Sequence, residues 1–252
     1  MNSRRFYLTL PSNASMQLYP NNTAAQYTIK LPRSINLDGG DWEVALTELS
    51  VPSIFDNVVS GTCYIKLTDH VNMIVNNYIV EPGHYNEASL LKYLNHRVAN
   101  NGILFVIENG KVELLNSGNF KAYLSSTLRN KLGFVNMLND GFEGGRHIAE
   151  NKCDINGETV QTLFIYCDIL EHVVVGDIMA PLLRMVDMKR KQSHGKMHEA
   201  PHAPLYVPLQ KKQFDTIEIN IMTDTGDPVH FVDGKTVIVL EFKRLGLLDK
   251  VV

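Results

Sequence analysis

Short stretches in which apolar and polar residues alternate make up much of this chain. In residues 25–31 the apolar side chains occupy every second position, and residues 42–46 repeat the pattern after a turn at 38–41. A period of two is typical of a β-strand that has one face against a core. The phase then slips between Glu48 and Leu49, which predicts a β-bulge or the end of that strand.

Further segments also have the pattern of strands. Residues 63–67 alternate, and residues 73–80 form another strand candidate. Residues 162–169 are apolar on both faces, which predicts a strand in the middle of a sheet that is covered on both sides. From the alternation in this strand and in two later ones we expect four side chains to be buried in the core: Leu163, Ile165, Ile219 and Val239.

The pattern changes between residues 83 and 137. Apolar residues recur at helical spacing in residues 87–98, directly after Asn86, a residue type that caps helices. Asn109 and Gly110 stand between two strand-like runs, which is a strong hairpin signal. A second short helix is expected to end at Gly133. The sequence therefore predicts an all-β sandwich with a small helix–hairpin–helix insertion, of α/β character, at about 83–137.

Length and composition are compatible with one large β domain. A chain of 252 residues is within the size range of single β-sandwiches, so we expect residues 1–252 to form one domain. With 44% hydrophobic and 20% charged residues the chain resembles an ordinary soluble globule. Residues 187–204 have almost no apolar content, which predicts a flexible loop in that domain.

The charge and the apolar runs limit the partners. A net charge of −3 argues against a general nucleic-acid coat, so we expect no specific nucleic-acid partner. No apolar run is long enough to cross a bilayer, and the start of the sequence lacks the apolar region of a signal peptide. We therefore expect no membrane-spanning segment.

The three cysteines do not indicate an enzyme. Cys63 and Cys167 lie in apolar strand patterns and are predicted to be buried free thiols, which is simplest in a reducing compartment. A cysteine protease needs a cysteine, a histidine and an orienting group. With nine histidines in the chain, any such match on paper is uninformative. Burial of Cys167 in a central strand would also raise its pKa and lower its reactivity.

Two groups of polar residues, one of histidines and one of aspartates, consist of residue types that can bind metal ions. His194, His198 and His202 are four residues apart, but Pro201 excludes the continuous helix that would bring them together, so we predict a soluble loop and no zinc site. The basic run 189–191 is too short to indicate phosphate binding. Three aspartates in the last quarter lack calcium-loop spacing and are predicted to form turns: Asp224, Asp227 and Asp233.

The common signatures of nucleotide-binding and hydrolytic enzymes are absent from the sequence. We therefore predict a non-enzymatic protein with no catalytic, cofactor-binding or metal-binding residues and no cofactor. Several tyrosines are compatible with either an interface or half-buried strand positions: Tyr7, Tyr19, Tyr78 and Tyr85. The residues alone thus indicate an all-β, intracellular, non-catalytic interaction protein.

Nine segments composed of core and turn residues, spread over most of the chain, carry a family resemblance. They include Phe6-Tyr-Leu-Thr-Leu-Pro11 and Gly83-His-Tyr-Asn86, and their ranges are 6–16, 19–23, 42–48, 83–86, 132–134, 163–169, 176–183, 214–219 and 237–242. In these segments the chain resembles the minor capsid (penton) proteins of Polinton, or Maverick, elements and of adintovirus-like viruses. The matching positions are structural, so no individual interface residue can be carried over.

The resemblance implies a structural virion protein with a single jelly-roll fold. Its members are expected to form homopentamers at the fivefold vertices of an icosahedral capsid, next to a separate and longer major capsid protein of the double-jelly-roll type. The resemblance also implies that the protein is made and assembled inside the host cell and is located in the virion. The length of this chain fits one jelly roll and is too short for two.

Two other classes of protein stay open on the sequence alone. The first is a non-catalytic, sugar- or receptor-binding β-sandwich, which would need exposed aromatic and carboxylate side chains that converge on one group of loops. The second is a hydrolase that uses cysteine or histidine outside the known motifs. The mass of the protein in solution separates them best, because only the penton class requires a pentamer.

Overall fold

The computed structural model describes residues 5–37, 39–69, 75–136, 141–156, 160–188 and 196–245. The chain divides into two compact units, each with a hydrophobic core of its own. The sandwich unit comprises Met1–Phe55 and Val160–Val252, and the inserted unit comprises Asp56–Thr159.

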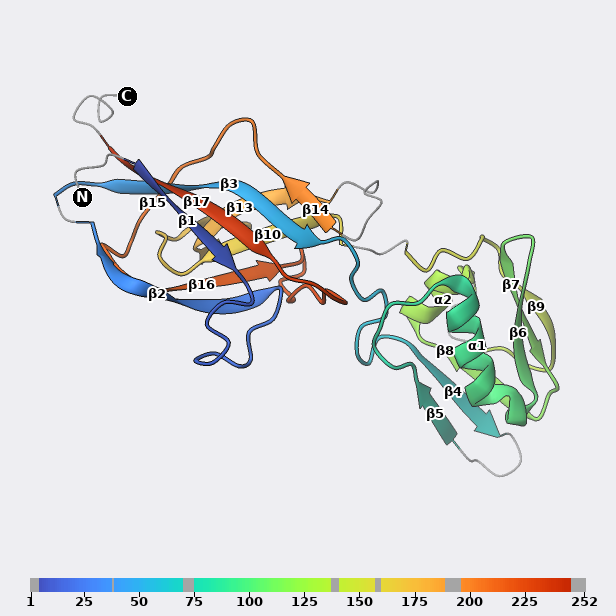
Figure 1. Ribbon diagram of the computed structural model, residues 1–252. Helices are drawn as coiled ribbons and strands as arrows, with labels where there is room; N and C mark the ends of the chain where they lie inside the picture. The colour runs from blue at the N-terminus through green and yellow to red at the C-terminus, as the bar shows by residue number, and fades with distance from the viewer. Residues whose placement is uncertain are drawn as a thin grey trace. The chain divides into compact units, whose positions relative to one another are not determined.

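Two antiparallel sheets form the sandwich unit (Figure 1). The first sheet has the order β1 (Arg5–Pro11), β17 (Val237–Arg244), β3 (Trp42–Pro52) and β14 (Lys196–Glu199), and the short β15 (Val207–Pro208) also pairs with β3. The second has the order β13 (Leu182–Asp187), β10 (Thr162–Cys167), β16 (Gln213–Met222) and β2 (Gln26–Asn36). A separate hairpin consists of β11 (Val173–Val175) and β12 (Ile178–Ala180).

The connections between the two sheets define the fold class. When β15 and the separate hairpin are set aside and the eight main strands are numbered along the chain, the first sheet has the order 1-8-3-6 and the second 2-7-4-5. This is the strand order of a jelly roll, in which eight strands are divided between two packed sheets. The prediction of a single jelly-roll sandwich is confirmed. The inserted unit follows the third of these strands and precedes the fourth.

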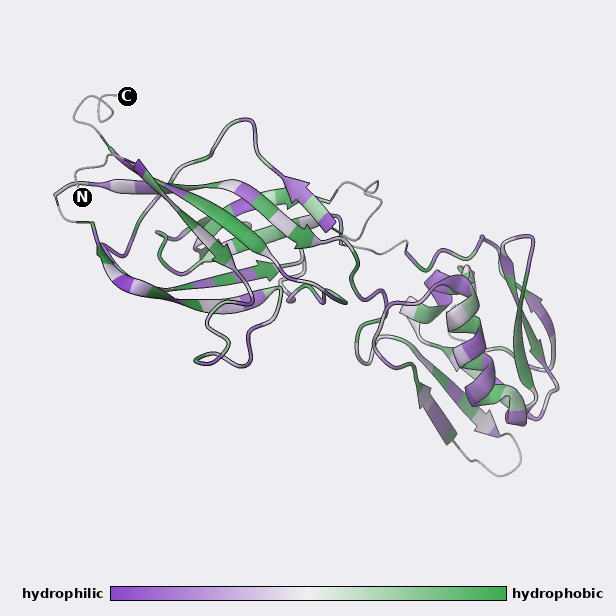
Figure 2. Ribbon diagram, in the orientation of Figure 1, coloured by the Kyte–Doolittle hydropathy of each residue, from purple (hydrophilic) through white to green (hydrophobic). Residues whose placement is uncertain are grey.

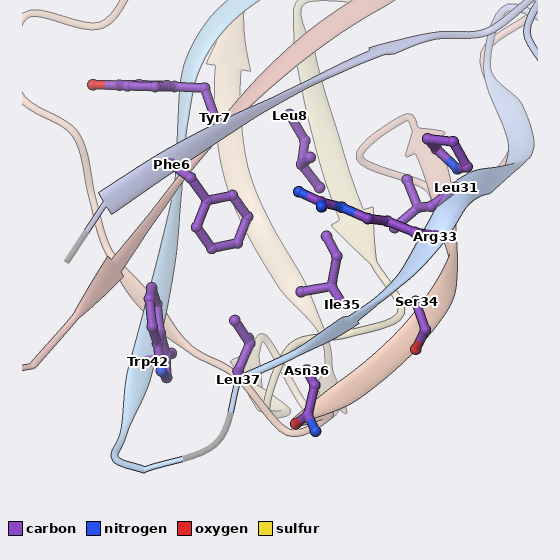
Figure 3. Close-up of a pocket in the computed structure, with 11 residues that line it drawn as sticks. Phe6, Tyr7, Leu8, Leu31, Arg33, Ser34, Ile35, Asn36, Leu37 and Trp42 are labelled. Atoms are coloured by element: carbon purple, nitrogen blue, oxygen red, sulfur yellow. The ribbon is translucent and has the colours of Figure 1, made fainter. Parts of the chain in front are cut away.

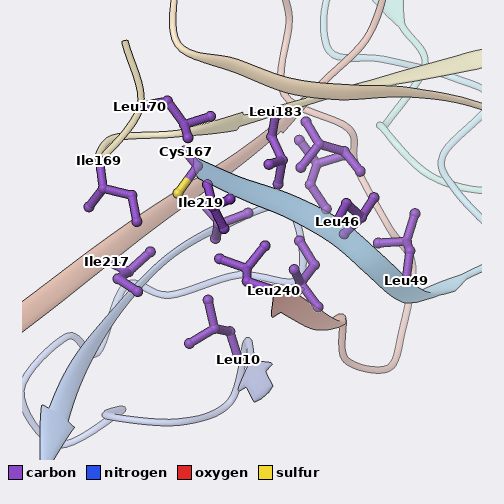
Figure 4. Close-up of a cluster of buried hydrophobic side chains, with 14 of the residues drawn as sticks. Leu10, Leu46, Leu49, Cys167, Ile169, Leu170, Leu183, Ile217, Ile219 and Leu240 are labelled. Carbon is purple, nitrogen blue, oxygen red and sulfur yellow. The ribbon is translucent and has the colours of Figure 1, made fainter. Parts of the chain in front are cut away.

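The core of the sandwich unit lies between the two sheets. Hydrophobic and hydrophilic residues alternate along its strands (Figure 2), and the apolar side chains of both sheets meet in one cluster (Figure 4). Leu163, Ile165 and Ile219 are fully buried there, as predicted. The prediction for Val239 is wrong, because its neighbours on β17 face the core and Val239 is half-buried on the opposite face. Residues 237–240 are all apolar, so the period of two does not show which face is inside.

The predicted irregularity in β3 is a β-bulge. Glu48 pairs with Val239 whereas Leu46 pairs with Leu240, so Thr47 is an extra residue in β3. The extra residue changes the alternation, and the buried positions after it include Leu49. The slip in the sequence pattern therefore reflects the bulge. The extra residue shifts the alternation by one position, so that apolar side chains before and after it both face the core.

The inserted unit combines two small sheets and two helices (Figure 1). One sheet has the order β5 (Val75–Ile79), β4 (Tyr64–Asp69) and β8 (Phe120–Leu124), and the other has the order β6 (Ile103–Glu108), β7 (Lys111–Asn116) and β9 (Gly145–Ile148). The helices are α1 (Glu87–Val98), which continues into the 3₁₀ turn η1 (Ala99–Asn101), and α2 (Ser126–Leu132).

The local signals in this unit are confirmed. Asn86 and Ser89 form a reciprocal capping box at the start of α1, and the leucines of α1 face the core. The Asn109-Gly110 turn joins β6 and β7, which pair from Glu108 and Lys111 onward. Gly133 ends α2, as the sequence predicts.

The extent of the insertion differs from the prediction of about 83–137. The compact unit runs from Asp56 to Thr159, because β4 and β5 pair with β8, and β9 pairs with β7. The chain therefore has two compact units where a single domain is predicted. Alternation identified residues 63–67 as a strand, but a strand pattern does not specify which sheet the strand joins.

The prediction of a flexible loop at 187–204 is wrong in part. Residues 189–195 lie outside the described residues, but Lys196–Glu199 forms β14, which pairs with β3 at the edge of the first sheet. Met197 is the one fully buried side chain of this strand. A strand points only every second side chain toward the core, so a strand of four residues at a sheet edge needs few apolar side chains. A mostly polar segment can therefore form such a strand.

Candidate assembly surfaces

A largely apolar groove of about 460 Å³ opens on one side of the sandwich unit (Figure 3). β1 contributes Phe6 and Leu8, which point into it, and β2 contributes residues 31–36. Trp42 at the start of β3 closes one end. Several lining side chains are only half-buried, so apolar surface of the core edge is accessible from outside.

Two strand edges flank this groove. Within the described residues β1 pairs only with β17, and β2 pairs only with β16. An edge strand presents backbone N–H and C=O groups that another chain can pair with. The groove therefore combines accessible apolar side chains with strand edges that have no strand neighbour in the part of the chain that the structure describes, and this combination is typical of a binding surface for a polypeptide.

Two polar groups belong to the groove. The Arg33 side chain extends from β2 toward β1 across the apolar residues (Figure 3). The indole Nε1–H of Trp42 is buried and has no hydrogen-bond partner among the described residues. Because Trp42 is the only tryptophan of the chain, its fluorescence reports on this groove alone.

The β11–β12 hairpin carries the second apolar surface. Val174 and Met179 are directly opposite each other in the hairpin and are 73% and 59% exposed. Ile178, next to the turn, is 56% exposed, and Asp177 lies in the turn itself. Because side chains alternate along a strand, Val174 and Met179 share one face of the hairpin and Ile178 lies on the other, so both faces expose large apolar side chains. Exposed apolar side chains gathered in this way are characteristic of an interaction site.

A buried carboxylate organises the outer face of the first sheet. Glu241 of β17 is only 5% exposed. Its Oε1 lies 3.3 Å from the Arg5 Nη1 atom, and its Oε2 accepts a hydrogen bond of 2.9 Å from the hydroxyl of Tyr206. Hydrogen bonding to Glu241 raises the pKa of the Tyr7 phenol, and burial together with the bond to Glu241 raises the pKa of Tyr206. This network holds the segment around Tyr206 against β17.

All three cysteines are buried and free, which confirms the prediction for Cys63 and Cys167. Burial raises the pKa of the Cys167 thiol to about 12. Cys153 lines a cavity of about 430 Å³ at the start of α1, where burial and then the Glu87 carboxylate raise its pKa to about 11. A thiolate is the nucleophilic form, so at neutral pH these two thiols are poor nucleophiles.

We expect thiol reagents to leave the native protein unlabelled. At neutral pH a chromogenic disulfide reagent should react with none of the three cysteines in the time that it needs to modify all three in denaturant, because the native thiols are buried and two have raised pKa values. Free glutathione serves as the reactive standard. Rapid labelling of one thiol in the native chain would instead identify an accessible, activated cysteine and favour the hydrolase class.

The polar groups that the sequence singled out are dispersed. His198 lies on β14 and His202 in the coil after it, while His194 and the basic run 189–191 fall outside the described residues. Asp227 accepts a hydrogen bond from the Thr225 hydroxyl within a turn. Among the described residues no three His, Cys, Asp or Glu side chains are grouped as a metal ion requires. Neither described helix has the length and apolarity needed to span a bilayer.

The four tyrosines differ in environment. Tyr78 and Tyr85 pack against the core of the inserted unit, and Tyr19 lines a shallow polar depression. Tyr7 is mostly exposed and belongs to the Glu241 network. Neither the groove nor the hairpin is predicted from the sequence above, although the Gly176-Asp177 pair between two apolar runs is a hairpin signal.

The sandwich unit thus defines a single-jelly-roll protein, and the structural comparison identifies similar proteins. The crystal structure of the mavirus penton protein superposes with a TM-score of 0.51 at 10% sequence identity, over 96% of this chain and 100% of that one. A cryo-EM structure of the Sputnik virophage matches with a TM-score of 0.49 at 9% identity, over 95% of this chain and 98% of that one. No family model and no curated protein matches the sequence.

The resemblance to penton proteins that the sequence indicates is confirmed at the level of the fold. The mavirus match covers nearly the whole of both chains, so it includes the inserted unit as well as the jelly roll. At this identity the likeness concerns the fold, and the individual surface residues have no assigned counterparts.

Proposed function

We propose that this chain is a structural protein of a virus particle and serves as a penton subunit. It forms homopentamers at the fivefold vertices of an icosahedral capsid and contacts a separate major capsid protein there. It acts by assembly and not by catalysis. On this proposal it is made inside the host cell and becomes part of the virion.

One observation carries the proposal: the jelly roll and its inserted unit together match the mavirus penton protein from end to end. Two features of this chain support it. The native thiols are buried, and the sandwich unit has an open apolar groove and an exposed apolar hairpin, which are surfaces suited to contacts between proteins. Burial of apolar surface supplies most of the affinity in such contacts, and polar groups at the edge set the register.

We expect the purified protein to assemble into a pentamer. Multi-angle light scattering at micromolar and higher concentrations should show a species of five times the 28.4 kDa chain mass, in exchange with the monomer if the fivefold contacts are weak outside the capsid. A stable dimer or trimer would contradict the penton assignment. A protein that is monomeric at every concentration and binds glycans would favour the sugar-binding class.

A further inference from the structure

We propose that the β11–β12 hairpin of one copy inserts into the groove between β1 and β2 of the next copy. This inference rests on the proposed assembly into rings and specifies which surfaces make the contact. The occupant of the groove is thus a second copy of this chain, and the same contact is repeated at each step around the ring.

The two surfaces complement each other in apolar character. The hairpin projects the Val174–Met179 pair from one face and Ile178 from the other, while the groove exposes half-buried apolar side chains between two strands, Phe6 among them. Insertion of the hairpin would remove the apolar side chains of both faces and of the groove from water. An aromatic floor that receives aliphatic side chains is a common centre of binding energy in interfaces. A hairpin in this place also presents backbone groups to the edges of β1 and β2, which have no further strand neighbour among the described residues.

The two surfaces also complement each other in charge. Asp177 lies in the hairpin turn and Glu171 precedes the hairpin, whereas Arg33 extends across the groove. A carboxylate that enters the groove beside a guanidinium gains a charge-assisted contact and fixes the direction of insertion.

The position of the surfaces in the fold makes the contact head-to-tail. The groove lies at the β2 edge of the second sheet, and the hairpin connects β10 and β13 at its other edge. Both surfaces lie toward the same end of the strands, since the Glu171 N–H donates to the Pro208 carbonyl and the Leu209 N–H donates to the Trp42 carbonyl. They are nevertheless two different surfaces of one copy, at different edges of the second sheet. Contacts of this kind use two different surfaces, and they generate a closed ring when the rotation between successive copies divides a full turn.

Trp42 gives a direct measurement of the contact. As the full-length protein is concentrated, we expect its emission to shift to shorter wavelength and its quenching by acrylamide to fall, in step with the rise in mass seen by light scattering. In Ile178→Asp both changes should require about tenfold or more protein. The matched control is Ile148→Asp, which charges an isoleucine of the inserted unit that is 52% exposed, and it should behave like the wild type.

A charge exchange tests the pairing of individual residues. Arg33→Glu and Asp177→Arg should each weaken assembly, because each places like charges in the contact. The double variant should recover most of the wild-type assembly. If either single substitution acted by unfolding the protein, the second substitution would not restore assembly. Circular dichroism of each variant confirms that the fold is intact.

The outcomes separate this inference from the proposed function. Pentamers that form equally well in Ile178→Asp, or Trp42 emission that does not change on assembly, would overturn the hairpin contact and leave the penton assignment standing. Hairpin-dependent assembly into dimers or trimers would support the contact and contradict the penton assignment. Equal losses in Ile178→Asp and Ile148→Asp, failure of the double variant to recover, or a chain that stays monomeric at every concentration would overturn the contact.

Discussion

Replacement of Ile219 by alanine is expected to lower the free energy of unfolding of the sandwich unit by about 2–5 kcal/mol. Ile219 is fully buried in the middle of β16, which pairs with β10 on one side and β2 on the other. Its side chain lies in the core among Leu10, Cys167 and Leu240 (Figure 4). Truncation leaves a cavity between two sheets whose backbones are held in register, so little collapse can compensate for the lost contacts.

Denaturant unfolding followed by Trp42 fluorescence measures this effect, because Trp42 lies in the sandwich unit. The matched control is Ile54→Ala, at an exposed isoleucine of the same unit, where the change should stay within about 0.5 kcal/mol. A loss of that small size for Ile219→Ala would place β16 at the surface and contradict the two-sheet arrangement.

Replacement of Gly133 by alanine is expected to destabilise the inserted unit strongly. Gly133 ends α2 at a φ of +87°, and an added Cβ would lie 2.3 Å from the carbonyl oxygen of Asn151. The left-handed conformation alone costs an alanine about 1–2 kcal/mol. The Asn151 backbone cannot easily move away from the added Cβ, because the Asn151 N–H donates a hydrogen bond to the Gly133 carbonyl oxygen. Relief of the clash should therefore cost about 1–3 kcal/mol more.

The helical circular-dichroism signal reports on this unit, because both described helices belong to it. The control is Gly110→Ala, in the same unit and at a φ of +78°, where the nearest atom to an added Cβ is 3.5 Å away. It shares the conformational cost and lacks the clash. Gly133→Ala should therefore unfold at a lower denaturant concentration than Gly110→Ala, while the Trp42 transition stays in place. Equal effects of the two substitutions would exclude the backbone contact at Gly133.

Local features of the fold could be predicted from the sequence because a few neighbouring residues decide them. Asn86 and Ser89 satisfy the backbone groups at the start of α1 within one turn. The Asn109-Gly110 pair specifies the β6–β7 hairpin, and the slip between Glu48 and Leu49 indicates the bulge in β3, which lies at Thr47. Each of these signals depends on backbone conformation or on hydrogen bonds over a short stretch of chain.

Assignments that depend on distant partners could not be predicted in this way. The strand pattern of β4 is the same whether it joins the sandwich or a separate sheet, and only its pairing with β5 and β8 places it in the inserted unit. The polar β14 becomes a strand because the edge of β3 supplies its backbone hydrogen bonds and the core has room for Met197. Val239 faces outward because Ile238 and Leu240, its two neighbours in β17, are the residues that point into the core.

The sequence by itself determined that this protein is an all-β sandwich with an inserted hairpin and helices, and its core and turn residues indicated the penton family. The tertiary structure alone decided the two compact units, the groove beside Trp42 and the exposed hairpin with Val174 and Met179. The physical reason is that alternation records whether a side chain is apolar, whereas exposure depends on what the rest of the chain places over it. An apolar residue on an uncovered surface has the same sequence signal as one in the core.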